Sequence, residues 1–188
     1  MVMATCLIGL IFARLVAGQQ TESVRSQPEP GQVETPSTPP KRELTLEDRA
    51  DIFMARKSYA DAVDSYFRAL KERRMSDASL WNKLGIAYQQ QIRYSAARNA
   101  YKKAIRYKRD FAEPWNNLGT TYFLENKAGK SIKYYRRAIT LNPANASFHL
   151  NLGTSLYQRK KYAEAVEEYR VAISLDPNVL TDRSTVGT

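Results

Sequence analysis

The chain has very little histidine and cysteine, two residue types on which many catalytic and metal sites depend. Its 188 residues include one histidine, His149, and one cysteine, Cys6. Zinc sites in proteins use three or four ligands, drawn mostly from these two residue types, so a zinc site is not expected. No Ser-His-Asp or Cys-His set with a nucleophile motif can be assembled either. We therefore expect neither an enzyme nor a bound cofactor or metal.

Glycine is also scarce, and three of the eight glycines, Gly85, Gly119 and Gly153, recur 34 residues apart. Each follows a leucine inside a helical apolar pattern, where glycine costs about 1 kcal/mol relative to alanine. The repeated cost indicates a repeated close approach of a second helix, with small residues of that helix as the expected partners. Three further rows share the interval: Ala97, Ser131 and Ala165; Tyr101, Tyr135 and Tyr169; Ala104, Ala138 and Ala172.

The spacing of these rows resembles that of the tetratricopeptide repeat. This repeat is a helix–turn–helix unit of 34 residues with the pattern W-x2-L-G-x2-Y…A-x3-F…P. The resemblance implies an all-α, right-handed solenoid of about four repeats. We expect them at residues 43–77, 78–111, 112–145 and 146–179, with turns at 57–58, 92–93, 126–127 and 160–161. The first repeat is offset by 35 residues, which places one extra residue near Asp77. His149 stands where Trp81 and Trp115 stand in other repeats, so a core or part-buried role is expected.

The two ends of the chain differ in composition from the repeats. Residues 1–18 combine an apolar run with small residues, which is typical of a signal peptide, although no Lys or Arg precedes the run. We expect export to the periplasm or the exterior; a membrane-associated or a cytoplasmic protein is the alternative. Residues 19–42, rich in Pro, Gln, Ser and Thr, are predicted to be a disordered linker. The tail, 180–188, is too short for a closing helix. Either the chain is a fragment of a longer array, or its last helix pair leaves an apolar edge for a partner.

The net charge of +10 is concentrated in the two central repeats, since residues 93–137 hold 12 Lys and Arg against 3 Asp and Glu. Seven of these cations form what we call the basic patch: Lys102, Lys103, Arg106, Lys130, Lys133, Arg136 and Arg137. They fall on second helices, which form the convex side in tetratricopeptide folds. The patch is either a solvated face or a docking surface for an acidic protein or an anionic lipid surface. Nucleic acid is the least favoured partner, because no nucleic-acid-binding motif accompanies the charge.

The same register identifies first-helix residues that would line a concave groove. They are Asn82, Lys83, Gln89, Asn116, Asn117, Thr120, Phe123, Asn151, Thr154 and Tyr157, with Ile86 and Leu150 at further inner positions. Side-chain amides donate and accept at once, so a ladder of asparagines can hold an extended peptide. The alternative is that asparagine is merely tolerated on an exposed helix face. Glu47, Asp48 and Asp51 at the N-terminal end would suit a basic peptide terminus.

These features favour a protein–protein interaction scaffold that binds an extended peptide or a partner helix in the groove. Two other functions stay open. The repeats would serve as the targeting module of a longer enzyme or assembly machine, or they would bind an anionic surface through the basic patch.

Overall fold

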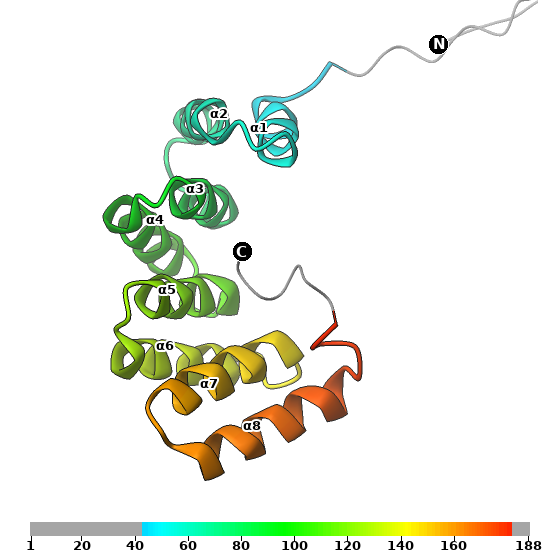
Figure 1. Cartoon of the computed structure of the whole chain (residues 1–188). Helices are drawn as coiled ribbons and strands as arrows, with labels where there is room; N and C mark the ends of the chain where they lie inside the picture. Colours follow the sequence, from blue (N-terminus) through cyan, green and yellow to red (C-terminus); the bar gives the residue numbers. More distant parts are fainter. Residues whose placement is uncertain (1–42, 182–188) are drawn as a thin grey trace, which may run out of the picture. The chain divides into compact units, whose positions relative to one another are not determined.

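The computed structural model describes residues 43–181, which fold into eight α-helices joined by short turns (Figure 1). The helices are α1 (Leu46–Ala55), α2 (Tyr59–Glu72), α3 (Ala78–Gln90), α4 (Tyr94–Tyr107), α5 (Ala112–Leu124), α6 (Ala128–Leu141), α7 (Ala146–Gln158) and α8 (Tyr162–Leu175). They form four antiparallel pairs that stack in sequence order, which confirms the expected all-α solenoid. No helix within 43–181 is long and apolar enough to cross a membrane. The predicted signal peptide and linker, and residues 182–188, lie outside the described part.

In each pair, the turn between the first and the second helix contains a residue in the left-handed conformation, at the same position of the repeat. These residues are Lys57, Ile92, Asn126 and Lys160, with φ of 59°, 62°, 59° and 61°. The next N–H in each turn donates to a carbonyl five residues back, at 2.9, 3.0, 2.8 and 3.0 Å in chain order. This arrangement satisfies carbonyls at the end of the first helix. The four turns therefore lie where the sequence predicts them.

The connection between α2 and α3 contains the extra residue that the 35-residue offset requires. It runs from residue 73 to 77, whereas the later connections run from 108 to 111 and from 142 to 145. Arg74 and Met75 both have positive φ, 51° and 59°, which accommodates the insertion. Asp77 then caps the N-terminus of α3, because its side chain accepts a hydrogen bond from Leu80 N at 3.0 Å.

The repeated glycines lie against the rings of the repeated tyrosines. A Cβ at Gly119 would lie 2.6 Å from two ring carbons of Tyr135, and one at Gly153 would lie 2.6 Å from the ring of Tyr169. Close approach is thus the reason for these glycines, and the atoms nearest to each belong to a tyrosine ring rather than to the alanines named from the sequence. A large ring therefore lies closest to each glycine, and at Gly153 the backbone oxygen of Ala165, 3.3 Å from the added Cβ, is also among the three nearest atoms.

One ring nitrogen at the start of α3, α5 and α7 ties each helix to the preceding loop. The bonds join Trp81 Nε1 to Met75 O (2.8 Å), Trp115 Nε1 to Arg109 O (3.4 Å) and His149 Nε2 to Pro143 O (3.0 Å). His149 therefore replaces tryptophan as the donor in the same bond. It is 8% exposed, and its Nδ1 lies 2.7 Å from Glu168 Oε2. The expected core role of His149 is confirmed.

Candidate functional site

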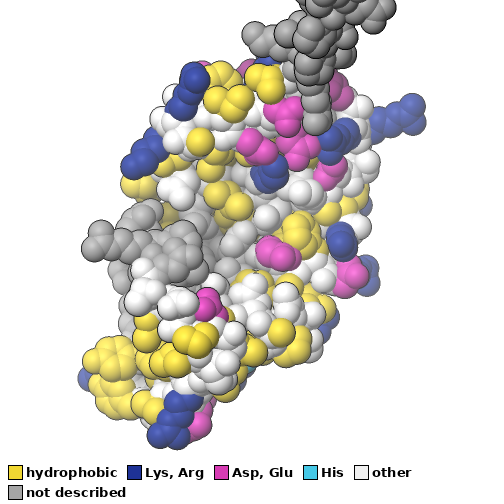
Figure 2. Space-filling model, turned by 90° about the vertical axis from the view of Figure 1, so that its right-hand side faces the viewer, with side chains coloured by type: hydrophobic (Ala, Val, Ile, Leu, Met, Phe, Trp, Pro, Cys, Tyr) yellow, Lys and Arg dark blue, Asp and Glu magenta, His cyan; other side chains and the backbone are white. Residues whose placement is uncertain are grey.

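The first helices of the pairs, α1, α3, α5 and α7, form one side of the array. Figure 2 shows this side, on which acidic and basic side chains gather toward the N-terminal pair, and hydrophobic and neutral atoms dominate the C-terminal half. The predicted groove residues lie on α3, α5 and α7. The N-terminal and C-terminal halves of this side differ in their contacts.

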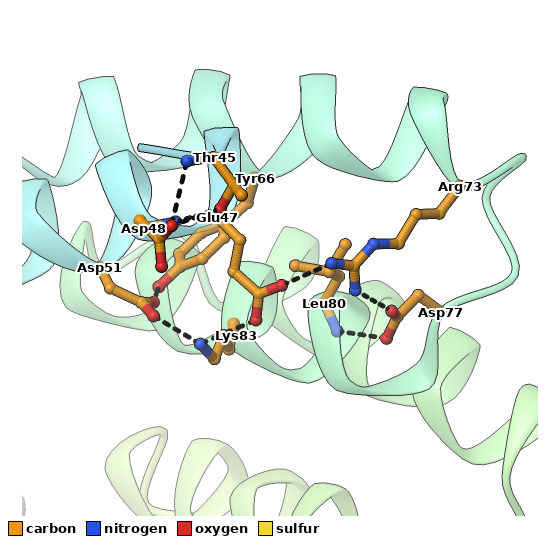
Figure 3. Close-up of polar contacts among 9 residues, drawn as sticks. All are labelled: Thr45, Glu47, Asp48, Asp51, Tyr66, Arg73, Asp77, Leu80 and Lys83. Atoms are coloured by element: carbon orange, nitrogen blue, oxygen red, sulfur yellow. Dashed lines mark hydrogen bonds and ion pairs between the residues drawn. The ribbon is translucent and has the colours of Figure 1, made fainter. Parts of the chain in front are cut away.

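The N-terminal end is occupied by ion pairs within the chain (Figure 3). Lys83 Nζ lies 2.6 Å from Asp51 Oδ2 and 3.0 Å from Glu47 Oε1. Arg73 lies 2.9 Å from the other oxygen of Glu47. Burial lowers the pKa of Lys83, but hydrogen bonds to the two carboxylates outweigh it and raise the pKa above its ordinary value. Two of the three carboxylates expected to receive a basic peptide terminus, Glu47 and Asp51, are thus already paired with cations of the same chain, whereas Asp48 forms the capping box of α1 with Thr45.

Two further contacts hold this cluster in place. Tyr66 on α2 donates its hydroxyl to Asp51, and burial together with that carboxylate raises the pKa of Tyr66. Arg73 also pairs with Asp77, the residue that caps α3. The cluster therefore joins the first and second helix pairs, and its cations are held in place by neighbouring side chains.

The four asparagines of the predicted ladder are hydrogen-bonded to one another across three helices. The bonds run from Asn151 Nδ2 to Asn116 Oδ1 (3.0 Å), from Asn116 Nδ2 to Asn117 Oδ1 (3.3 Å) and from Asn117 Nδ2 to Asn82 Oδ1 (3.0 Å). Asn82 is 8% exposed, so this end of the ladder is buried. An amide has two N–H donors and an oxygen with two lone pairs, so a half-exposed member such as Asn151 retains capacity for a ligand. The ladder both links α3, α5 and α7 and fixes the direction of its amides.

Other polar groove residues accept hydrogen bonds from the hydroxyl groups of the tyrosine row. Tyr135 Oη donates to Thr120 Oγ1 at 3.2 Å, and Tyr169 Oη donates to Thr154 Oγ1 at 3.5 Å. In the second repeat, the position of these threonines is taken by Ile86. Tyr101 there donates to Gln89 Oε1 instead, at 3.1 Å. The second helices thus support the groove from behind.

A cavity of about 120 Å³ opens between α5 and α7 in the C-terminal half of the groove. Its lining is Thr120, Phe123, Leu124, Tyr135, Leu150, Asn151, Thr154 and Leu180. The fold therefore brings together five residues predicted for the groove, Thr120, Phe123, Leu150, Asn151 and Thr154. Tyr157 lies apart from them, 60% exposed and edge-on to Tyr162 with ring centroids 5.3 Å apart.

Two apolar residues of this lining, Leu124 and Leu180, were missed at the sequence level. In the neighbouring repeats, the positions equivalent to Leu124 are glutamines, Gln90 and Gln158. Leu124 therefore belongs to no row of repeated residues. Leu180 follows the last repeat and is positioned by its neighbour Val179, which is 1% exposed and packs with Leu150. No repeat register extends to that segment, and hence no signal in the pattern identifies it.

The basic patch lies on α4 and α6, and all seven of its cations are exposed. Among the described residues, only Arg136 of the seven forms an ion pair, with Glu164 at 3.0 Å. Lys130 lies over the ring of Tyr122 at 5.6 Å, and the Arg137 guanidinium lies over the ring of Trp115 at 5.7 Å. Residues 43–181 hold no group of three His, Cys, Asp or Glu side chains arranged to bind a metal ion.

Comparison with known proteins agrees with this architecture. The family model of the tetratricopeptide repeat matches residues 82–146 and 125–179, which together span just over half of the chain. The chain belongs to the tetratricopeptide repeat family. Such a fold points to a protein–protein interaction scaffold, and scaffolds of this kind are typically not catalytic.

Among solved structures, two crystal structures of MamA are similar to this tetratricopeptide protein, each at 20% sequence identity. One gives a TM-score of 0.64 over 72% of this chain and 79% of that chain. The other gives 0.63 over 73% and 75%. At this identity the likeness shows the fold alone. No curated protein matches the chain.

Proposed function

We propose that the tetratricopeptide repeats bind an extended segment of a partner protein in the groove, with the cavity between α5 and α7 receiving an anchor side chain. The observation that carries the proposal is the composition of this cavity. Phe123, Leu124, Leu150 and Leu180 give it apolar walls, and Asn151 adds an amide. An apolar pocket with a few placed polar groups is the usual design of a recognition site.

The asparagine ladder favours an extended segment over a helix as the ligand. An extended segment has free backbone N–H and C=O groups. An amide such as Asn151 can accept a hydrogen bond from one of these N–H groups and donate one to a C=O group at the same time. A helix uses those same groups for its internal hydrogen bonds and leaves few for the groove. The internal bonds of the ladder orient the amides before the ligand arrives, which reduces the entropy lost on binding.

The charge distribution along the groove gives the bound segment a preferred position. At the N-terminal end, Glu47 and Asp51 are paired with Lys83 and Arg73, so a charged ligand there must displace existing ion pairs. Within the described residues, the C-terminal half of the groove has no such cluster of ion pairs, and it contains the cavity. We therefore place the anchor residue of the ligand over α5 and α7.

The test uses peptides selected from a random peptide library on the full chain, with affinities measured by fluorescence anisotropy. Asn151→Ala should weaken binding about tenfold, because it removes a hydrogen bond at a desolvated contact. Leu124→Glu should abolish binding by placing a charge in the apolar wall. Asn99→Ala, on the exposed face of α4, is the matched control and should leave the affinity unchanged.

If Asn151→Ala and Asn99→Ala change the affinity equally, the proposal that the groove binds the peptide is contradicted. If Arg137→Glu abolishes binding and Leu124→Glu does not, the anionic-surface alternative is supported in its place.

A further inference from the structure

The helices that carry the basic patch contain no acidic residue. α4 has four Lys or Arg and no Asp or Glu, and α6 has the same composition. The outer helices mix the two signs: Arg68 pairs with Asp64 on α2 at 3.8 Å, and Arg170 pairs with Glu167 on α8 at 3.3 Å. Like charges three and four residues apart, such as Lys133 and Arg137, destabilise a helix slightly. Helix stability therefore does not account for the patch.

The repeat pattern does not require the cations either. Lys133 of α6 aligns with Asn99 on α4, with Asp64 on α2 and with Glu167 on α8. An asparagine and two acids thus occupy this position in the other repeats. The positive charge is a property of the two central repeats alone, which is typical of a localised electrostatic surface.

A pocket of about 360 Å³ lies within the patch, and two of its lining residues are aromatic. Its lining is Trp115, Lys133, Tyr134, Arg136, Arg137 and Thr140. The rings of Trp115 and Tyr134 lie 6.2 Å apart, and Tyr134 stacks on Tyr122 with centroids 5.2 Å apart. Arg137 covers part of Trp115, so apolar rings and a cation meet at the same opening.

A carboxylate of the chain itself already binds at the edge of this pocket. Glu164 on α8 accepts a hydrogen bond from Arg136 at 3.0 Å and one from Lys161 at 2.8 Å. The bond from Lys161, together with the charges of Lys161 and Arg136, lowers the pKa of Glu164. The pair shows how a carboxylate is received at the rim. Lys133 and Arg137, on the same rim, have no acidic partner among the described residues.

We propose that this pocket binds an acidic segment of a partner protein. One aliphatic or aromatic side chain of that segment packs against Trp115 and Tyr134, and its carboxylates pair with Lys133 and Arg137. The site lies on the second helix α6, with Trp115 contributed by the first helix α5, and it shares no lining residue with the groove cavity. A membrane surface fits less well, because Tyr107 is the only exposed large hydrophobic residue that the structure shows on α4 and α6. Nucleic acid fits less well, because both rings are only half-exposed, Tyr134 is already stacked on Tyr122 and Arg137 lies over Trp115, which leaves little open ring face for a base.

The probe is a fluorescent acidic peptide with one central leucine, titrated against the full chain by anisotropy at low and moderate salt. We expect Lys133→Glu with Arg137→Glu to weaken binding by about tenfold or more, because two attractive charges become repulsive. Arg68→Glu is the matched control, since Arg68 occupies the position of Arg137 in the first repeat, and it should leave the affinity unchanged. A peptide with glycine in place of leucine should bind more weakly. Circular dichroism checks that each variant is folded.

Equal losses in the control and in the double variant would overturn the proposal, because diffuse charge would then explain binding. So would tighter binding to phosphatidylserine vesicles or single-stranded RNA than to the peptide. If the double variant does not fold, Arg137→Lys replaces it, since lysine keeps the charge but loses the planar contact with Trp115. An unchanged affinity in that variant would overturn the role of the pocket.

Discussion

Replacement of Gly119 by alanine tests whether the contact between glycine and tyrosine determines the packing of each helix pair. Alanine should favour the helix by about 1 kcal/mol. Its Cβ, however, would lie 2.6 Å from two ring carbons of Tyr135 and 3.1 Å from a third. Tyr135 is 2% exposed and is held by Thr120, so the ring has little room to move. Overpacking costs about 1–3 kcal/mol, and with the upper value the net loss of unfolding free energy is about 2 kcal/mol.

Gly129 provides the matched control for this substitution. It lies in the first turn of α6, and a Cβ there would meet nothing within 4 Å. Gly129→Ala should therefore stabilise the protein by up to about 1 kcal/mol. Because helix propensity contributes to both variants, the difference between them reports mainly the steric cost at Gly119.

Urea unfolding of the full chain, followed by circular dichroism, measures both effects. With a slope of about 2 kcal/mol per molar urea, Gly119→Ala should lower the midpoint by about 1 M. Gly129→Ala should raise the midpoint. If Gly119→Ala proves as stable as the unmodified chain, the ring of Tyr135 moves freely and our account of the glycine row is refuted.

Two polar contacts give further predictions. Burial disfavours ionised Glu125, but hydrogen bonds from Arg98 and Lys127 outweigh it and lower the pKa of Glu125. The stability that this carboxylate contributes is therefore present above pH 4.5, its ordinary pKa, and is lost as the pH falls through the lowered value. Glu125→Gln should flatten that part of a curve of stability against pH measured by urea unfolding. His149→Phe leaves the carbonyl of Pro143 without its donor and should cost about 1–3 kcal/mol in thermal unfolding. His149→Trp, the residue type of this row, should retain more of the stability.

The repeat register predicts the helices and their turns because identical packing problems recur along the array. The same rows did not reveal which facing residue meets each glycine. Alanine and tyrosine rows both lie on the second helices, and spacing alone does not determine whether Tyr135 or an alanine points at Gly119. That choice depends on the side-chain direction and on the hydroxyl bond to Thr120, which only the three-dimensional arrangement provides.

The candidate site was predictable in position but not in its contacts. Register places Asn116 and Asn151 on the inner face, yet their hydrogen bond depends on rotamers that the sequence does not specify. Lys83 stands as the only clear basic residue of the groove in the sequence, whereas the fold pairs it with Asp51, 32 residues earlier. The pair of Lys83 and Asp51 combines residues that do not recur in the other repeats, and a pattern of repeated residues cannot predict it.

Helix α6 connects the two proposed binding sites, because adjacent residues on it reach both. Tyr134 lines the basic pocket, and Tyr135 lines the groove cavity. Successive side chains on a helix point about 100° apart, so a single helix can contribute to two separate surfaces. If the acidic peptide shifts α6 when it binds, the ring of Tyr135 must move with the backbone and change the cavity. Coupling of this kind is reciprocal, so each peptide would then alter the affinity of the other by the same factor. Titration of each peptide with the other at saturation measures that factor, and a factor of one would mean that α6 stays fixed and the two sites act independently.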